Sequence, residues 1–245
     1  MSFDGAGPSS GAFRIGFIAA LDVEYLSLRR AAAGDDSWLL LQSGPGPARA
    51  TAAAARALDA GARLLVSFGF AGALDAGVVS GTVLAPRRIL AEGAPPLVVS
   101  PPWHARVAAL ADEFQLASGD LLTVPAALES PAAKRAAALA SGAVAVDMES
   151  ATVAAAAARA GVPFVALRVI VDALDDALPR GALAFVDERG NRRIKPVLRA
   201  MLSAGQWRPL VTLTRRYGLA RRVLQRLAHA LAVRRVLAGD VAARG

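Results

Sequence analysis

Short apolar runs that alternate with helical patterns constrain the fold of this chain more than any other feature. Strands are expected at residues 13–20, 38–42, 64–68, 82–90, 97–99, 121–124, 144–146 and 164–171, and helices at 23–33, 46–60, 103–114, 131–140 and 149–160. Such alternation favours a sheet with helices on both of its faces. We therefore predict the α/β class, as a three-layer α/β/α arrangement around a central mixed, mostly parallel sheet.

Composition divides the chain into three parts. Residues 1–12 form a leader rich in Gly, Ser and Pro, and residues 13–190 carry the alternating pattern of the α/β domain. Residues 191–245 are predicted to form a basic amphipathic helical extension that packs on or next to that domain. Its helices are expected at 194–203 and 209–238, with Gly205 and Gly218 as breaks.

The basic residues are unevenly distributed along the chain. The formal net charge is +8, and residues 192–239 contain twelve Arg or Lys and no Asp or Glu. A block of one sign suggests an anionic surface as partner, and lipid head groups suit an amphipathic basic helix better than nucleic acid does. A general preference for arginine is the alternative explanation, because only Lys134 and Lys195 are lysine.

Several classes of protein are excluded by what the sequence lacks. There is no cysteine, which excludes disulfides, thiol catalysis and cysteine-metal sites. The longest apolar tract, 151–171, is interrupted by Arg159, Gly161, Pro163 and Arg168, so it predicts a helix and a strand instead of a membrane span. We expect a cytoplasmic protein, peripheral at the inner membrane if its basic helices bind lipid.

Three carboxylates follow predicted strands, where ligands bind in open α/β sheets. Asp22 suits a helix cap. Glu24, two residues further along the chain, is a candidate general base. Glu149 is suited to accept two hydrogen bonds from a vicinal diol such as that of ribose. Asp172 ends a β-branched strand, where partial burial would favour a proton donor. The structural alternatives are helix capping for Asp147 and Glu149 and a position in a solvated loop for Asp172.

Glycine-rich turns are expected at 43–46 and 69–72, and they would allow a ligand to approach the backbone. Neither turn completes a dinucleotide-binding fingerprint, and no nucleophile-elbow motif is present. Both histidines, His104 and His229, fall on predicted helices, and no constellation of metal-binding residues is seen.

Taken together, these segments resemble the nucleoside phosphorylase and nucleosidase superfamily, over about residues 13–176. The resemblance rests on segments 15–24, 43–46, 67–74, 146–150 and 161–172, whose order and spacing match the motifs of this family. It implies that Glu24 is the catalytic base and that Asp172 protonates the purine. It further implies that Glu149 binds the ribose hydroxyls, that Met148 packs on the ribose, and that the turn Gly69, Phe70, Ala71 and Gly72 contributes to substrate binding. No cofactor or metal is implied, although phosphate would be a co-substrate in a phosphorylase, and a homo-oligomer is expected.

Two departures from the family pattern bear on the reaction. Ser67 and Phe70 stand where the hexameric phosphorylases carry the Arg and Ser that hold phosphate, which favours water as the nucleophile. Arg49 or Arg168 would be the remaining phosphate contacts.

The Arg-rich tail, together with Val-Asp-Met-Glu-Ser at 146–150, looks like the hopanoid-associated branch of the superfamily. That likeness implies release of adenine from adenosylhopane, a lipid-linked nucleoside. A methylthioadenosine/S-adenosylhomocysteine nucleosidase and a general purine nucleoside phosphorylase are the enzymatic alternatives. The alternative of another class is a non-catalytic basic module that binds membrane or nucleic acid. The leucines of the tail are expected to form an apolar stripe that faces lipid or, alternatively, packs on the domain or on a second subunit.

Overall fold

One long strand, β3 (Ala62–Ala73), joins the two halves of the sheet in the computed structural model, which describes residues 13–178 and 207–238. Strand β1 (Arg14–Ala19) runs parallel to its first half, and β10 (Phe164–Asp172) runs parallel to most of its length. Strand β9 (Ala145–Asp147) pairs antiparallel with its last residues. The strands that border the functional site therefore all meet near the carboxyl end of β3.

The remaining strands extend the sheet to both sides. Strand β2 (Trp38–Gln42) lies beside β1, while β8 (Asp120–Thr123), β5 (Arg88–Ala91) and β6 (Leu97–Val98) continue from β9. Strand β4 (Val83–Leu84) pairs with β10, and β7 (Leu116–Ala117) pairs with β4. Most of these pairs are parallel, and the antiparallel ones are β3–β9, β4–β10 and β5–β6. The predicted mixed, mostly parallel sheet is confirmed.

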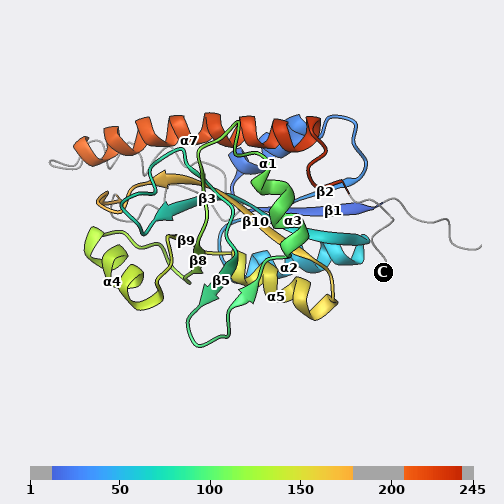
Figure 1. The fold of residues 1–245 in the computed structure, drawn as a ribbon, viewed down its shortest axis with the longest axis horizontal. Helices are drawn as coiled ribbons and strands as arrows, with labels where there is room; N and C mark the ends of the chain where they lie inside the picture. The colour runs from blue at the N-terminus through green and yellow to red at the C-terminus, as the bar shows by residue number, and fades with distance from the viewer. Residues whose placement is uncertain (1–12, 179–206, 239–245) are drawn as a thin grey trace, which may run out of the picture.

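Helices cover both faces of the sheet (Figure 1). Helices α1 (Asp22–Ala31) and α7 (Trp207–Val233) lie on one face, and α2 (Pro47–Asp59) and α5 (Ser150–Ala160) lie on the other. Helix α3 (Pro101–Ala108) packs near β10, and α4 (Pro131–Ser141) lies beside the β8–β9 end of the sheet. The three-layer α/β/α arrangement is as predicted.

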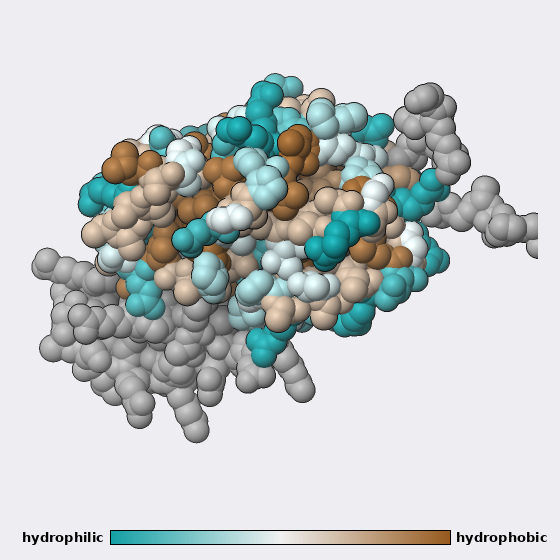
Figure 2. Space-filling model, turned by 90° about the horizontal axis from the view of Figure 1, so that it is seen from below, coloured by the Kyte–Doolittle hydropathy of each residue, from teal (hydrophilic) through white to brown (hydrophobic). Residues whose placement is uncertain are grey.

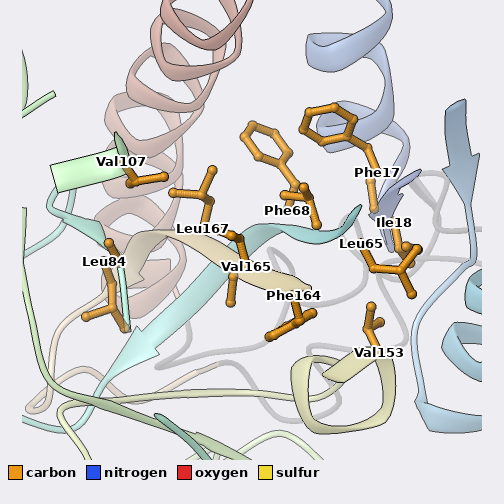
Figure 3. Close-up of a cluster of buried hydrophobic side chains, with 14 of the residues drawn as sticks. Phe17, Ile18, Leu65, Phe68, Leu84, Val107, Val153, Phe164, Val165 and Leu167 are labelled. Carbon is orange, nitrogen blue, oxygen red and sulfur yellow. The ribbon is translucent and has the colours of Figure 1, made fainter. Parts of the chain in front are cut away.

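The apolar core is divided by the sheet into two layers, which Figure 3 shows in section. Phe17, Phe68 and Leu167 point toward α1 and α7, while Leu65 and Phe164 lie on the side of Val153 of α5. Strand side chains alternate between faces, so the continuous apolar runs of β1, β3 and β10 fill both layers. The alanine-rich faces of α2 and α5 allow a close approach to the sheet. A methyl group at Gly16 would lie 2.8 Å from Cβ of Ala57.

Helix α7 is the clearest departure from the predicted tail. It continues through Gly218 without a break, whereas the sequence predicted one there. Leu224, Leu227 and Leu231 are buried in the main core, so this part of the apolar stripe packs on the domain and does not face lipid. Packing of this apolar face offsets the weak helix propensity of a single glycine. No helix in the described ranges is long and apolar enough to cross a membrane.

Three further expectations need correction. Residues 69–72 belong to β3 and do not form a turn. The strand predicted at 82–90 is divided into β4 and β5, because Pro86 lies between them and a proline cannot donate to the ladder. The helix predicted at 103–114 ends at Ala108, and β7 was not foreseen. The leader, the helix at 194–203 and the boundary at 190 lie outside the described residues.

The surface shows no single dominant apolar area in the view of Figure 2. Hydrophobic residues gather there in patches between hydrophilic ones. The most exposed large apolar side chains among the described residues are Leu139 on α4, with 90% of its surface exposed, and Val98 on β6, with 67%. Isolated apolar residues of this kind are common on protein surfaces and do not by themselves define an interface.

Candidate active site

A cavity of about 210 Å³ lies where β1, β3, β9 and β10 end. Among the described residues, its charged lining consists of four carboxylates and one ammonium group, from Glu24, Asp147, Glu149, Asp172 and Lys134. The rest of the described lining is mainly apolar: Ala20, Leu21, Pro45, Phe70, Ala71, Gly72, Val124, Ala127, Leu128, Val146, Met148, Val171 and Leu178. An apolar site with a few convergent charged groups is typical of an enzyme that binds a small molecule.

Glu24 is held at the start of α1 by backbone amides. Its Oε2 accepts hydrogen bonds from the N–H groups of Ala20 and Leu21 at 2.9 and 2.8 Å, and its Oε1 accepts one from Phe70 at 2.9 Å. The sequence assigned this capping role to Asp22, but the structure gives it to Glu24. Burial raises the pKa of the Glu24 carboxyl, and Arg168 and the three amides oppose that rise. Oε1 keeps a lone pair that is able to accept a proton from water.

Glycines of β3 make room for the carboxylates of Glu24 and Asp172. A Cβ atom at Gly69 would lie 2.6 Å from Nη1 of Arg168 and 2.7 Å from Cδ of Glu24. One at Gly72 would lie 3.1 Å from Oδ2 of Asp172. Both positions lie within the strand. Glycine is therefore needed there because it has no side chain, and not because the backbone adopts a turn conformation.

Glu149 stands directly before α5 and reaches across to the start of α2. Its Oε1 accepts a hydrogen bond of 2.9 Å from the N–H of Gly46. Gly46 has φ of +102°, a conformation that favours glycine, so the turn at 43–46 presents this amide to the site. Burial, with Asp147 nearby as a second negative charge, raises the pKa of Glu149 to about 7. The capping alternative for Glu149 fails, since its side chain makes no cap bond.

Asp172 lies at the end of β10 and pairs with Lys134 of α4. Both side chains are buried, and Lys134 also donates to the carbonyl oxygens of Ala173 at 2.7 Å and Asp176 at 3.1 Å. Burial raises the pKa of Asp172, while the Lys134 ammonium opposes that rise. The alternative of a solvated loop acid is therefore wrong for Asp172.

A buried ion pair supports the site from behind. Nη2 of Arg168 lies 2.6 Å from Oδ2 of Asp147 and donates to the hydroxyls of Ser67 at 2.6 Å and Ser150 at 2.9 Å. Asp147 also accepts from the Ser150 N–H at 3.1 Å, in agreement with a capping role, and from the Thr123 hydroxyl at 2.7 Å. Nη2 of Arg168 is thus committed to internal partners, whereas its buried Nε has no hydrogen-bond partner in the described part of the chain.

Neither arginine considered for phosphate lines the carboxylate cavity. Arg168 is buried behind it, and Arg49 lines a separate surface cavity with Gln42, Ser43, Gly44 and Arg56. Within the described ranges, no group of three His, Asp or Glu side chains is arranged to hold a metal ion.

The structure brings together most of the residues predicted for the site. Glu24, Phe70, Ala71, Gly72, Met148, Glu149 and Asp172 all line the cavity, whereas Gly69 lies beneath Glu24 and Arg168. Sequence reasoning missed Lys134, which appeared only as part of a predicted helix. One signal was present, because Lys134 is one of two lysines among 28 basic residues. An ammonium group is a compact donor that a guanidinium does not replace in a small buried space.

The fold and this cavity together define an enzyme of the nucleosidase and nucleoside phosphorylase class. The chain belongs to the phosphorylase superfamily, whose family model matches residues 28–203. No curated protein sequence matches the chain significantly.

Solved structures share the fold at low sequence identity. A 5'-methylthioadenosine/S-adenosylhomocysteine nucleosidase from Helicobacter pylori has a TM-score of 0.67 and 18% identity, over 93% of this chain and 99% of that one. Futalosine hydrolase from the same organism has a TM-score of 0.65 and 19% identity, over 83% and 99%. S-adenosylhomocysteine nucleosidase from Streptococcus pyogenes has a TM-score of 0.61 and 20% identity, over 89% and 99%.

Proposed function

We propose that this chain is a purine nucleosidase that hydrolyses the N-glycosidic bond and releases adenine. The observation that carries the proposal is the convergence of Glu24, Glu149 and Asp172 on one cavity. Asp172 protonates N7 of the base, so that the base leaves as a neutral molecule when the bond to C1' breaks. Glu24 takes a proton from the water that attacks C1', and Glu149 accepts hydrogen bonds from the ribose hydroxyls.

The charge of the cavity supports water as the nucleophile. In the described lining, Asp147 is paired with Arg168 and Asp172 with Lys134, so Glu24 and Glu149 supply the negative charge that favours the positive charge developing on the ribose. The same two carboxylates disfavour a phosphate dianion beside them, and neither Arg49 nor Arg168 lines the cavity to bind it.

The nucleophile is tested by incubating the protein with adenosine and 5'-methylthioadenosine, with and without phosphate. Hydrolysis in H₂¹⁸O places the label on C1' of the sugar and does not depend on phosphate. Formation of a ribose 1-phosphate would show that the protein is a phosphorylase. Glu24→Gln and Asp172→Asn are each expected to lower kcat by about 10²–10⁴-fold.

For the group attached to the ribose, we propose a lipid-linked adenosyl compound of the adenosylhopane type. The resemblance of the 146–150 segment and the basic tail to the hopanoid-associated branch supports this choice. No described side chain of α7 contributes to the lining of the cavity. Adenine release from adenosylhopane, compared by kcat/KM with release from soluble nucleosides, is the test.

The second candidate is a nucleosidase for 5'-methylthioadenosine or S-adenosylhomocysteine. It is favoured by the likeness in fold to the nucleosidases of Helicobacter pylori and Streptococcus pyogenes. A kcat/KM for these soluble compounds well above that for the lipid-linked substrate would select this candidate.

Peripheral membrane contact through the solvent face of α7 belongs to the same proposal. Arg215, Arg221 and Arg222 are exposed there, and the helix contains no acidic residue. Each arginine near an anionic bilayer contributes about 1 kcal/mol to binding. Changing all three to Gln should abolish salt-sensitive sedimentation with phosphatidylserine vesicles. The matched control changes three exposed arginines away from α7, Arg56, Arg135 and Arg159.

Nucleic acid binding and self-association are settled by two simple measurements. Salt-dependent binding to DNA, in a protein that cleaves no adenosyl compound, would favour the non-catalytic basic module. We propose a homo-oligomer, and light scattering in solution, which gives the mass of the particle, tests this.

A further inference from the structure

Lys134 is a buried cation whose hydrogen-bonding capacity is fully used inside the protein. Its side chain is 1% exposed, and its Nζ donates to the carboxylate of Asp172 and to the carbonyl oxygens of Ala173 and Asp176. An ammonium group has three N–H donors, and each has an acceptor. Lys134 therefore has no donor left for a substrate, and any effect on the reaction passes through Asp172 and the loop after β10.

That loop is held from a second side by the C-terminal helix. Arg216 of α7 pairs with the carboxylate of Asp176, which also accepts a hydrogen bond of 2.8 Å from the N–H of Ala173. The charged groups that act on Asp172 are thus Lys134 from α4, Asp176 from its own loop and Arg216 from α7. Lys134 is the only one of these that contacts the Asp172 carboxylate directly.

A proton donor in a buried site has two conflicting requirements. It must hold its proton at neutral pH, which burial of Asp172 favours. It must also release the proton to the leaving base, and an isolated buried carboxylate is a costly product. An ammonium group in contact with the carboxylate lowers that cost at the moment of transfer.

We propose that Lys134 is a positioning residue that fixes the Asp172 carboxyl and stabilises the carboxylate formed when the proton moves to the base. This role rests on the proposed function, because it assumes that Asp172 is the acid. The proton passes from the Asp172 oxygen to N7 of the purine, and the electron pair of the broken glycosidic bond remains on the base. Lys134 keeps its own protons throughout.

The test is the pH dependence of Lys134→Met, which removes the charge but retains much of the side-chain volume. Without the cation, the carboxylate is less stable, so the pKa of Asp172 rises. The basic limb of the kcat profile, where Asp172 loses its proton, should therefore move upward by about 1–2 pH units. The plateau of kcat should fall by roughly 10- to 100-fold, because the acid is weaker and less well placed.

Two further variants separate charge from simple damage to the fold. Lys134→Arg keeps a cation in a larger side chain, so its basic limb should move much less than that of Lys134→Met, even if kcat falls. Arg135→Met removes a neighbouring cation on the same helix, whose partner is the exposed Asp175 in the same loop, and should leave the profile unchanged. An equal shift in Lys134→Met and Lys134→Arg, or a shift in neither, would overturn the role of Lys134.

A readout that does not require activity keeps this inference distinct from the proposed function. In protein labelled with ¹³C at the aspartate carboxyls, Asp172→Asn identifies the Asp172 signal, and Lys134→Met should shift its titration to higher pH. An unchanged titration overturns the inference even if the wild type releases adenine. A shifted titration in a protein that cleaves no nucleoside would overturn the proposed function and leave the electrostatic pairing intact. With a nitrophenyl riboside, whose leaving group needs no proton, Lys134→Met should lose less than tenfold in kcat.

Discussion

Gly69 lies beneath Glu24 so closely that a Cβ atom at this position would be 2.7 Å from the carboxyl carbon of Glu24. The same atom would be 2.6 Å from Nη1 of Arg168. The strand therefore passes under the candidate base only because it has no side chain there. This contact links a sequence feature, a glycine inside an otherwise bulky strand, directly to the geometry of the site.

Gly69→Ala should displace Glu24 and Arg168, because the added methyl group would overlap both side chains. We expect a loss of kcat of at least about 100-fold, since misplacement of a reacting group by 1 Å has an effect of that size. The measurement is adenine release together with urea denaturation. Gly218→Ala is the control, because its site on α7 is open and alanine should stabilise the helix by up to about 1 kcal/mol. Full activity in Gly69→Ala would refute this account of β3.

Glu149→Gln should raise stability at high pH while it impairs ribose binding. Burial raises the pKa of Glu149 in the folded protein to about 7, above the ordinary value of 4.5, so the folded state binds a proton more readily than the unfolded state does. The proton on Glu149 stabilises the folded state fully at a pH below the pKa that Glu149 has in the unfolded chain. This stabilisation is lost as the pH rises through about 7. Removing the ionisable group should therefore stabilise the fold by about 1–3 kcal/mol at pH 8, and by almost nothing near pH 4.

Denaturation of both proteins across this pH range measures the effect of Glu149→Gln. The exposed Glu92 supplies the control, and Glu92→Gln should show no such divergence between acid and alkaline conditions. A stability difference between Glu149→Gln and wild type that stays constant with pH would contradict the assignment.

The central strands and the three carboxylates were predictable because they depend on local patterns. A continuous apolar run indicates a strand buried on both faces, and a carboxylate after such a run lies at the ligand-binding edge. Lys134 was not predictable in this way, since its contact with Asp172 joins α4 to the end of β10 through tertiary packing. Likewise, Gly218 alone predicts a break, and only the burial of Leu224 and Leu227 against the sheet explains the continuous helix.

The stability of the protein should fall far more when one partner of the Arg168–Asp147 pair is lost than when both are lost. Each side chain is almost completely buried, so Arg168→Met or Asp147→Asn alone leaves an unpaired buried charge. Each single variant should lose about 3–5 kcal/mol of stability, whereas the double variant should lose much less than the sum. A double-mutant cycle by urea denaturation checks this. Additive losses would mean that the two groups do not interact as the geometry indicates.

Helix α7 should behave as part of the domain and not as a detachable tail. Leu227 is fully buried in the main core, so Leu227→Ala should cost about 2–5 kcal/mol of global stability. Exposed Arg222, five residues earlier on the same helix, is the matched control, and Arg222→Gln should change stability by less than about 0.5 kcal/mol. Helix α7 also carries Arg216, which pairs with Asp176 in the loop that follows the candidate acid Asp172. Leu227→Ala should therefore lower kcat under conditions close to the unfolding transition of the variant. A protein that keeps wild-type stability after Leu227→Ala would show that α7 packs only loosely on the sheet.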